Sequence, residues 1–319
     1  MKILVTGCCG FIGMHLSQEL LKKYDVIGID NINPYYDVNL KKHRLEILKR
    51  NKNFSFFKVD INNYKKLNLI FKKTRPKIVL HLAAEVGVRY SLTHPRKYIN
   101  SNLVGFFNIL ENCNNFKIKK LFYASSSSVY GDSYKKSLKE NLVIDKQLSI
   151  YAATKRASEI IANSYSYLYS FPIIGLRFFT VYGPYGRPDM AIFKYTDLIY
   201  KKKMIEIYDG GNLQRDFTYI DDLVYYIKNM INRKFPKTHQ IYNIGNNKPI
   251  KVSKIVSLIE NALNIKAKKK FTNAPKTEVE RTSANLSKLN NLIVLKKKTS
   301  IKSGINNFVS WYIKFNQNR

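Results

Sequence analysis

A tyrosine and a lysine four residues apart give the strongest chemical signal in this 319-residue sequence. They are Tyr151 and Lys155, the ends of the segment YAATK. On a helix, residues four apart lie on one face, so the phenol and the ammonium would address the same pocket. The reference pKa of tyrosine is about 10, and a neighbouring cation lowers it towards the pH at which a phenolate can act as a base. An exposed Tyr–Lys pair is the simpler alternative in a chain with 23 tyrosines.

Four consecutive serines upstream change that balance. Ser125 to Ser128 stand directly before a Val-Tyr-Gly segment at 129–131 and follow a predicted strand at Leu121–Ala124. Hydroxyl groups at the end of that strand could reach the same reacting oxygen as the Tyr151 phenol. The serines and the Tyr–Lys pair together favour acid–base catalysis at one site over a purely structural role.

Three glycines near the amino terminus indicate a nucleotide-binding loop. Gly7, Gly10 and Gly13 lie between a predicted strand at Ile3–Thr6 and a predicted helix that runs through Leu21. Glycine is needed where a chain turns sharply and where its backbone approaches a pyrophosphate at the positive end of a helix dipole. Turn glycines alone would explain the heptad, but its position between a strand and a helix favours the functional interpretation. We expect two residues inside this loop to lie against the cofactor, Phe11 and Ile12.

An acid follows at the distance that this interpretation requires. Asp30 ends the second predicted strand, Val26–Asp30, 17 residues beyond Gly13. A carboxylate there can accept hydrogen bonds from both ribose hydroxyls and would repel the additional phosphate of NADP. The sequence therefore predicts NAD as the cofactor, with Asn31 beside the same ribose, in preference to a surface aspartate in a turn.

Residues after the third and fourth predicted strands complete the expected cofactor site. Asp60 and Ile61 follow the strand at Phe54–Val59 and could meet the adenine, although Asp60 could equally cap the next helix. The strand at Ile78–Leu82 runs into two alanines, whose small side chains would let the backbone lie against the cofactor. These expected contacts are Leu82, Ala83 and Ala84. We interpret the preceding His81 as a buried core histidine.

The alternation of short apolar runs with amphipathic stretches predicts an α/β fold of the Rossmann type, a doubly wound parallel sheet. A further strand is expected at Ile173–Arg177, and helices are expected at Tyr64–Lys73, Pro95–Cys113 and Tyr151–Tyr169. Beyond about residue 180 the regular alternation ends. We therefore predict an NAD-binding domain at 1–179 and mainly a substrate-binding lobe at 180–319, with a strand near 240–244 returning to the main sheet.

Composition restricts the remaining possibilities. A net charge of +33 suggests a nucleic-acid ligand, but the lysines are scattered in small groups and no nucleic-acid-binding motif accompanies them. No apolar run approaches the roughly 18 residues of a membrane span, and no signal peptide is expected. The three cysteines are Cys8, Cys9 and Cys113. They cannot form a disulfide framework and lack metal-ligand spacing, so we expect a cytoplasmic protein without a metal site.

At these residues the chain resembles the NAD-dependent epimerase/dehydratase family of extended short-chain dehydrogenases/reductases, over essentially its full length. The matching features are the three loop glycines, Asp30, the two alanines, the serine run and the Tyr151–Lys155 pair. Within the family it is most similar to the UDP-glucuronate 4-epimerase branch in four segments, DNINPYYDVNLK at 30–41, GVRYS at 87–91, VYGPYGRPDMA at 181–191 and RDFTYIDD at 215–222.

The resemblance implies NAD-dependent conversion of UDP-glucuronate to UDP-galacturonate through a 4-keto intermediate. It makes Tyr151 the base, while Lys155 tunes it and holds the nicotinamide ribose, and Ser126 bonds the sugar 4-hydroxyl beside Ser127 and Ser128. Arg89 and Arg215 are then expected at the UDP phosphates. The other expected substrate contacts are Thr180 and Arg187 around the sugar carboxylate, Glu278 at the uridine ribose, and Met190.

Two departures from the family pattern stand out. Lys276-Thr277-Glu278-Val279 replaces the usual Pro-Gly-Asp-Val, so the Glu278 carboxylate stands one methylene farther out than the family aspartate. Glu85 replaces the usual glutamine, beside the place where cofactor and sugar are expected to meet. The resemblance also implies a homodimer formed through the predicted helices at Pro95–Cys113 and Tyr151–Tyr169. Phe106, Phe107 and Ile109 are the apolar residues expected to contribute to it.

Related activities remain as alternatives. Sugar-nucleotide 4,6-dehydratases carry an Asp-Glu pair directly before Val-Tyr-Gly, and UDP-glucuronate decarboxylases a glutamate two residues before the tyrosine. Ser127 and Ser128 occupy those positions here, which favours an epimerase. A UDP-glucose or UDP-N-acetylhexosamine 4-epimerase is the second interpretation. A non-catalytic nucleotide-binding or nucleic-acid-binding protein on the same scaffold is a third, of a different class.

Overall fold

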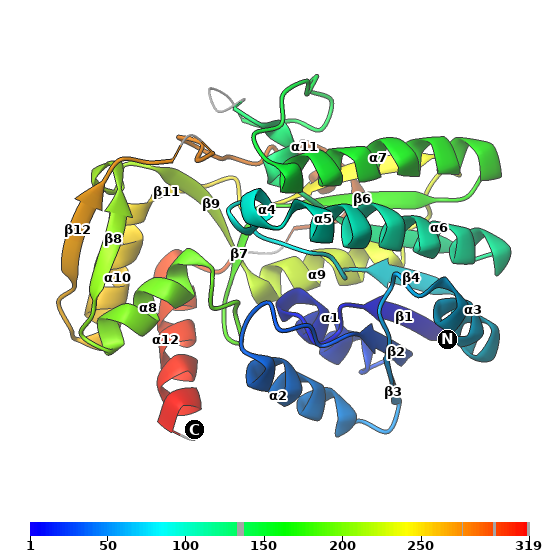
Figure 1. Ribbon diagram of the computed structural model, residues 1–319, viewed down its shortest axis with the longest axis horizontal. Coiled ribbons are helices and arrows are strands. Elements are labelled where there is room, and N and C mark those ends of the chain that lie inside the picture. The colour runs from blue at the N-terminus through cyan, green and yellow to red at the C-terminus, as the bar shows by residue number, and fades with distance from the viewer. Residues whose placement is uncertain (133–136, 276, 296–297, 318–319) are drawn as a thin grey trace. The chain divides into compact units, whose positions relative to one another are not determined.

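The computed structural model describes residues 1–132, 137–275, 277–295 and 298–317, which form two compact units. Both units are discontinuous in sequence. The first unit comprises Met1–Gly131, Val143–Phe178 and Ile227–Tyr242, and the second comprises Asp132–Leu142, Phe179–Tyr226 and Asn243–Arg319. Figure 1 traces the chain and labels its elements.

A seven-stranded sheet forms the centre of the first unit, in the order β10-β6-β5-β4-β1-β2-β3. All neighbouring strands from β6 to β3 pair in parallel. The strand order reverses between β1 and β4, which makes the carboxyl ends of these two strands the topological switch point where doubly wound sheets bind ligands. This arrangement confirms the predicted fold class. The strands are β1 (Lys2–Thr6), β2 (Asp25–Asp30), β3 (Phe54–Lys58), β4 (Ile78–His81), β5 (Lys120–Ser126), β6 (Ile173–Phe178) and β10 (His239–Ile244).

The central strands are apolar because helices cover the sheet. Leu4, Val79 and Leu121 each have no exposed surface and belong to one core cluster. Helices α3, α6 and α7 contact one another in a row, whereas α1 contacts β1, β2 and α2. The helices of this unit are α1 (Phe11–Leu20), α2 (Val38–Lys49), α3 (Tyr64–Thr74), α4 (Tyr90–Thr93), α5 (Pro95–Tyr98), α6 (Phe106–Asn115) and α7 (Ile150–Tyr169).

The single helix predicted at Pro95–Cys113 is divided into three segments. Between α5 and α6 lies a π-helical stretch, η1 (Ile99–Gly105), a form that adds one residue per turn and often marks functional sites. Within it, Asn102 is 2% exposed and turns its side chain towards the site described below. Hydrophobic periodicity does not distinguish this stretch from an α-helix.

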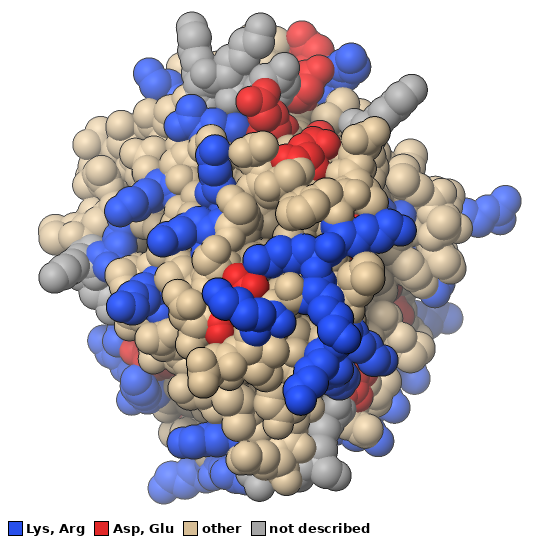
Figure 2. All heavy atoms as spheres, turned by 90° about the vertical axis from the view of Figure 1, so that its left-hand side faces the viewer, with Lys and Arg blue, Asp and Glu red and all other residues tan. Residues whose placement is uncertain are grey.

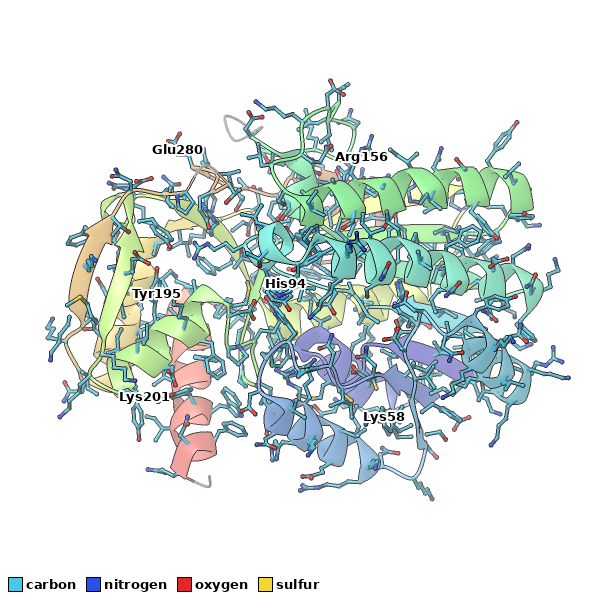
Figure 3. All side chains as sticks on the ribbon, viewed as in Figure 1. Lys58, His94, Arg156, Tyr195, Lys201 and Glu280 are labelled. Carbon is cyan, nitrogen blue, oxygen red and sulfur yellow. The ribbon has the colours of Figure 1, made fainter. Side chains whose placement is uncertain are left out.

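The second unit contains two small sheets and several helices where no regular alternation was expected. One sheet has the order β11-β9-β7, and the other pairs β12 with β8 in parallel. Tyr195 of α8 donates its hydroxyl to the Glu206 carbonyl of β8 (Figure 3). The elements are β7 (Thr180–Tyr182), α8 (Ala191–Tyr200), β8 (Met204–Tyr208), η3 (Asp209–Gly211), β9 (Gln214–Tyr219), β11 (Pro249–Lys251), α10 (Val252–Leu263), β12 (Lys268–Thr272), α11 (Ser287–Leu292) and α12 (Ile301–Gln317). Helix α9 (Ile220–Ile231) crosses from this unit into the first.

Lysine and arginine side chains are spread over the face drawn in Figure 2 in small groups, with fewer acidic side chains among them. Strand β12 contributes Lys268, Lys269 and Lys270, all exposed. Charged side chains on such a two-stranded edge protect it from pairing with other chains. No helix within the described ranges is long and apolar enough to cross a membrane.

Candidate active site

The glycine loop connects the end of β1 to the start of α1. Gly7 has φ +72°, and a Cβ on it would stand 2.8 Å from the Ala83 nitrogen after β4. A Cβ on Gly13 would lie 2.1 Å from the Gly7 carbonyl oxygen, so neither position accepts a side chain. Because Gly10 begins α1 without a side-chain cap and no acid stands in the first turn, the helix N-terminus keeps its backbone donors and positive dipole end for an anion.

Asp30 ends β2 beside this loop. Its carboxylate accepts hydrogen bonds from the backbone N–H of Cys9 at 3.0 Å and of Ile32 at 2.8 Å. The side chain is buried, and burial raises its pKa against the opposing effects of these donors and of Lys41. Lys41 lies on α2, one turn before the fully buried Arg44, whose guanidinium donates to the Cys9 carbonyl at 3.1 Å. A carboxylate so held is a fixed hydrogen-bond acceptor at the carboxyl edge of the sheet.

Lys41 and Arg44 were not identified from the sequence. The buried face of α2 combines leucines with these two cations, so an apolar pattern does not mark that face. Asp37 begins the helix by accepting from the Asn39 N–H at 2.9 Å, a signal that could have located it. The spacing of three residues between the two cations then places both on the face towards Asp30.

Asp60 does not cap the helix that follows it. Asn63 is the cap of α3, accepting from the Lys66 N–H. Asp60 instead accepts from the Asn62 N–H at 2.8 Å and from the Asn31 amide at 2.9 Å. It thereby joins the ends of β2 and β3, and the adjoining Ile61 is buried in the core cluster.

The end of β4 brings small residues to the glycine loop. Leu82 donates its N–H to the Thr6 carbonyl at 3.2 Å, and Ala83 donates to the Thr6 hydroxyl at 3.2 Å. His81 is buried, bonds the same hydroxyl at 2.8 Å and has a pKa lowered to about 3 by burial and by the Lys155 charge. This confirms the interpretation of His81 as a buried, hydrogen-bonded core residue.

Glu85 belongs to a network that includes the segment after β2. Its carboxylate accepts from the Asn33 amide at 2.8 Å, and Asn33 accepts from the Lys41 ammonium through its backbone carbonyl at 2.8 Å. The Glu85 backbone exchanges two hydrogen bonds with the Asn102 side chain, at 2.8 and 3.0 Å. Asn102 also donates to the Thr154 hydroxyl on α7 at 3.1 Å. The glutamate therefore connects residues near the cofactor loop with the helix that carries the Tyr–Lys pair.

Tyr151 and Lys155 both lie on α7. Ser149 caps the start of this helix, because its hydroxyl accepts a hydrogen bond from the Ala152 N–H at 3.1 Å. Tyr151 is half-buried and packs edge-on against Tyr98, with ring centroids 6.1 Å apart. Lys155 is buried and donates to the Ala124 carbonyl of β5 at 2.8 Å. Burial lowers the pKa of Lys155 to about 8, although the Glu159 charge acts in the opposite direction.

The serine run begins in the last residues of β5, next to Ala124, which Lys155 contacts. Ser126 accepts from the Ser128 N–H at 3.1 Å and donates its hydroxyl to that of Ser128 at 3.2 Å, which begins a short 3-10 helix at Ser127–Tyr130. Lys155 contacts Ala124, the residue directly before the serine run. The structure therefore brings the first turns of α7 close to the serines. Arg89, also in the first unit, is exposed beside α4.

The expected substrate residues of the second unit pair with acids of that unit. Arg187 donates Nε to the Asp189 carboxylate at 3.1 Å and a terminal nitrogen to its other oxygen. Arg215 on β9 donates to the Glu278 carboxylate at 2.7 Å. Thr180 starts β7, and Met190 stands at the start of α8. Lys276 lies outside the described residues.

Among the described residues, one group of possible metal ligands occurs, formed by Cys8, Cys9 and Asp30. Burial raises the pKa of the Cys8 thiol well above its ordinary value, and the two sulfur atoms are 3.9 Å apart. A protonated, buried thiol is a poor metal ligand. Cys8 and Cys9 instead belong to the glycine loop itself, which the Cys9 N–H joins to Asp30 at 3.0 Å.

Comparisons with known proteins agree with this arrangement. The family model described as GDP-mannose 4,6 dehydratase matches residues 4–308. Protein CapI of Staphylococcus aureus is 45% identical over 99% of both chains. A UDP-glucuronate 4-epimerase of Thermodesulfobacterium geofontis is 42% identical over 97% of this chain and 95% of its own. A crystal structure of UDP-glucuronic acid 4-epimerase from Bacillus cereus with UDP-glucuronic acid and NAD superposes with a TM-score of 0.93, at 34% identity, over 99% of this chain and 100% of its own.

Proposed function

Because this chain belongs to the GDP-mannose 4,6 dehydratase family of extended short-chain dehydrogenases/reductases, we propose that it is an NAD-dependent 4-epimerase that converts UDP-glucuronate to UDP-galacturonate. The single observation that carries the proposal is the site at the end of β5. Tyr151 and Lys155 stand on one helix face beside a serine run that lacks the acids of the dehydratases and decarboxylases. The similarity to epimerases whose names specify UDP-glucuronate supports the substrate.

The residues present fit NAD. The glycine loop leaves no room for side chains beside the α1 N-terminus, where a pyrophosphate would receive backbone hydrogen bonds. Asp30 presents a fixed carboxylate for ribose hydroxyls, flanked by Asn31, while Phe11, Ile12, Ile61 and the Leu82–Ala84 backbone would surround the cofactor. When bound, NAD supplies a hydride acceptor that later returns the hydride to the sugar.

The protein's own part in this chemistry is to move one proton and to hold the sugar. We assign the proton to the Tyr151 phenol, which would remove it from the 4-hydroxyl as general base. Lys155 would lower the phenol's affinity for that proton by its charge and would hold the nicotinamide ribose. Ser126, with Ser127 and Ser128 beside it, would bond the 4-hydroxyl and keep it aligned.

The absence of two acids distinguishes this proposal from the family's other reactions. Elimination of water needs an acid and a base directly before Val129, and the residues there are Ser127 and Ser128. A serine hydroxyl does not ionise at working pH and cannot take either part. The glutamate that UDP-glucuronate decarboxylases carry two residues before the tyrosine is also missing, because Ser128 stands there. The carboxylate of the sugar should therefore remain in the product. UDP-glucose is the competing substrate, because the same Tyr–Lys pair would epimerise it.

In the second unit, Arg215 is proposed for the UDP phosphates, together with Arg89 of the first unit. Thr180 and Arg187 are proposed around the sugar carboxylate, Glu278 at the uridine ribose, and Met190 as a further substrate contact. Support comes from the chemistry of the guanidinium group, whose parallel N–H donors match carboxylate and phosphate oxygens. Both guanidinium groups already bind carboxylates in the structure, Asp189 and Glu278. On substrate binding, each guanidinium would exchange this internal carboxylate for a carboxylate or phosphate of the UDP-sugar.

A panel of UDP-sugars tests the activity directly. The purified protein should convert UDP-glucuronate to UDP-galacturonate without added reductant and without releasing a pentose. UDP-glucose and UDP-N-acetylglucosamine, run in parallel, should react far more slowly. Preferential turnover of UDP-glucose would overturn the substrate assignment while leaving the Tyr151–Lys155 chemistry in place.

Homodimer formation through η1, α6 and α7 is part of the proposal. Apolar side chains on these helices remain exposed, among them Val104 at 49%, Phe107 at 42% and Ile160 at 56%. Phe106 and Ile109, expected to contribute, are instead buried in the core at 1% and 0%, because they point towards the sheet. Light scattering should give twice the 37.2 kDa chain mass, and a monomer at working concentration would contradict this.

We place the reaction in the cytoplasm. All three cysteines are free and buried in the structure, which suits a reducing compartment. Fractionation of cells that express the protein would test this, and recovery of the protein outside the cytoplasmic fraction would contradict it.

A further inference from the structure

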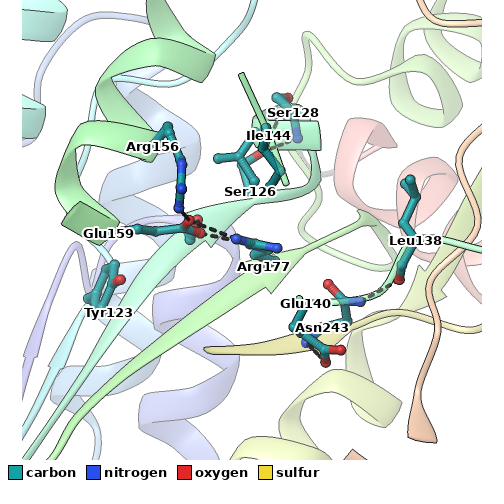
Figure 4. A network of polar contacts seen from close by, with 12 residues as sticks. Tyr123, Ser126, Ser128, Leu138, Glu140, Ile144, Arg156, Glu159, Arg177 and Asn243 are labelled. Carbon is teal, nitrogen blue, oxygen red and sulfur yellow. Dashed lines mark hydrogen bonds and ion pairs between the residues drawn. The ribbon is translucent and has the colours of Figure 1, made fainter. Parts of the chain in front are cut away.

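A buried ion pair lies one helical turn beyond Lys155 along α7. Glu159 on α7 accepts from Arg177 on β6 through both carboxylate oxygens, each at 2.8 Å. One of these oxygens also accepts from the Ser125 hydroxyl of β5 at 2.6 Å. The side chains of Glu159 and Arg177 are each 1% exposed, and Figure 4 shows the glutamate between the two arginines that bind it. Arg156, on the outer side, donates to the second oxygen at 3.1 Å.

This cluster and the lysine fasten α7 to neighbouring residues of one strand. Lys155 contacts the Ala124 carbonyl, and Glu159 contacts the next residue, Ser125. Ser126 follows at the end of β5. Because Tyr151, Lys155 and Glu159 are spaced by four residues, one face of α7 carries all three. A displacement of the helix at Glu159 would therefore change the position of Tyr151 relative to Ser126.

Among the described residues, Glu159 is the acid whose charge acts on Lys155. The titratable groups that face the lysine are Tyr151 and Glu159, one turn to either side on its own helix, and His81 from β4. His81 is neutral, since its pKa is lowered to about 3. On β5, the Tyr123 phenol has its pKa raised by burial and is also neutral. Burial alone would raise the pKa of Glu159, but the Arg177 hydrogen bonds lower it, so the carboxylate is ionised.

We propose that Glu159 is a positioning residue of the active site: held by Arg177 and Ser125, its carboxylate fixes α7 against the end of β5 and places a negative charge one helical turn from the Lys155 ammonium. Arg177 is in turn the residue that makes a buried carboxylate tolerable there, and its guanidinium also lies over the Tyr130 ring at 4.6 Å. The inference rests on the proposed function for the role of Lys155.

The sign of the effect follows from the charges. Lys155 must be cationic to act, so activity falls at alkaline pH as it loses its proton. Glu159 raises the pKa of Lys155. Removing the negative charge should therefore move the alkaline limb of the pH profile to lower pH. Residues four apart on a helix are neighbours, and an opposite charge within about 4–6 Å changes a pKa by about one unit or more.

Glu159→Gln tests this, because glutamine keeps the shape and one acceptor oxygen while losing the charge. We expect the alkaline limb of kcat to move down by about one pH unit. Turnover at neutral pH should fall roughly tenfold, with KM for the UDP-sugar nearly unchanged. Calorimetric titration with NAD across the same pH range should show the same displacement, because Lys155 is proposed to hold the nicotinamide ribose.

Arg156→Gln keeps the proposal testable if Glu159→Gln does not fold. Arg156 is half-exposed and projects from α7 (Figure 3), so its loss should be tolerated. Removing this cation leaves the Glu159 charge less compensated, and the alkaline limb should move in the opposite direction, to higher pH. Ser125→Ala, which removes one hydrogen bond and no charge, should reduce turnover several-fold without moving the limb.

Glu260→Gln is the matched control. Glu260 is also a buried carboxylate, held by the Ala267 N–H at 2.9 Å and by Lys269 at 3.0 Å, but it belongs to α10 in the second unit. It should lower thermal stability without moving either pH profile. A Glu159→Gln protein that is folded and keeps the parental alkaline limb would overturn the inference. Lack of any turnover of UDP-glucuronate by the unmodified protein would instead overturn the proposed function, and the NAD titration would still test the Glu159 effect.

Discussion

The two units hold their proposed site residues in different ways. In the first unit, Lys155 and Glu159 are buried and bound to neighbouring strands, and Asp30 is fixed by two backbone donors. In the second unit, Arg187 and Asp189 are 19% and 31% exposed, and Arg215 and Glu278 are 15% and 25% exposed. The first group is therefore preorganised, whereas the second is paired internally within reach of solvent.

The difference follows the chemistry that each unit is proposed to perform. A base must stand in a fixed position relative to the atom it deprotonates, because small displacements of reacting groups are costly in rate. A site that binds and releases a charged sugar nucleotide can instead exchange one carboxylate or phosphate for another. Internal partners such as Asp189 also avoid leaving a guanidinium without hydrogen bonds before the substrate arrives.

The preorganised part should be the more sensitive to substitution. Tyr151→Phe removes only the phenolic hydroxyl, and turnover of UDP-glucuronate should fall by about 10²–10⁴-fold or more. NAD should remain bound, because the glycine loop and Asp30 are unchanged. Product analysis by chromatography measures the rate, and calorimetry measures NAD binding. Near-normal epimerisation by the variant would show that another residue is the base.

Arg187 tests the exchange of partners in the second unit. A hydrogen bond to a charged group contributes about 1.5–3 kcal/mol, so Arg187→Ala should lower kcat/KM for UDP-glucuronate roughly 10- to 100-fold. Residual activity on UDP-glucose should change much less. The variant should also release some carbon dioxide and a pentose product, because the carboxylate is no longer held.

Asp189→Asn is the companion to Arg187→Ala. It weakens the internal competitor for the guanidinium, so KM for UDP-glucuronate should fall. Equal losses by Arg187→Ala on both sugars would mean that the arginine only braces the loop between β7 and α8.

Cofactor preference gives an intermediate effect. Asp30→Ala removes the acceptor for the ribose hydroxyls and should weaken NAD binding roughly tenfold. The same change should narrow the preference over NADP, since a negative charge near the additional phosphate is lost. Titration of both cofactors against both proteins measures this. If the unmodified protein bound NAD and NADP equally, Asp30 would have a structural role only.

A surface ion pair of the first unit should give the smallest effect. Glu19 on α1 bonds Lys22 at 2.6 Å and also Lys228. Burial raises the pKa of Glu19, but the two lysines together lower it by more, so the net shift is downward. A carboxyl group whose pKa is lower in the folded state stabilises the fold at pH values above its pKa in the unfolded chain. This stabilisation disappears as the pH falls through the pKa of the folded state. Glu19→Gln should cost less than ~1 kcal/mol at pH 7 and nothing in acid, as measured by thermal unfolding at both pH values.

The sequence was most informative where chemistry and chain order coincide. Alternating apolar runs predicted the parallel sheet, and the residues just after each strand predicted the positions of Asp30, Ala83 and the serines. In a parallel sheet all strands end at one edge, so residues far apart in sequence meet there. The spacing of Tyr151 and Lys155 needed only a helix, and α7 supplies it.

Contacts that depend on packing could not be predicted in this way. Periodicity does not tell which face of η1 and α6 meets the sheet, so Phe106 and Ile109 were expected at an interface although they are core residues. Lys41 and Arg44 share the buried face of α2 with three leucines, so polar and apolar residues do not separate into two faces there. The Glu159–Arg177 pair joins a helix to a strand 18 residues away, and two charges of opposite sign at that separation give no signal in a single sequence.

The discontinuity of the first unit has a consequence for how the chain folds as it is made. The unit includes Ile227–Tyr242, which supplies part of the strand beside β6 and the end of α9. At about 5–20 residues per second, a ribosome needs roughly 3–13 s to pass from Phe178 to Tyr242. During that interval the edge of β6 lacks its neighbour β10, while the first elements of the second unit are synthesised. Completion of the sheet that carries the Tyr–Lys chemistry is thus delayed until most of the polypeptide has been synthesised.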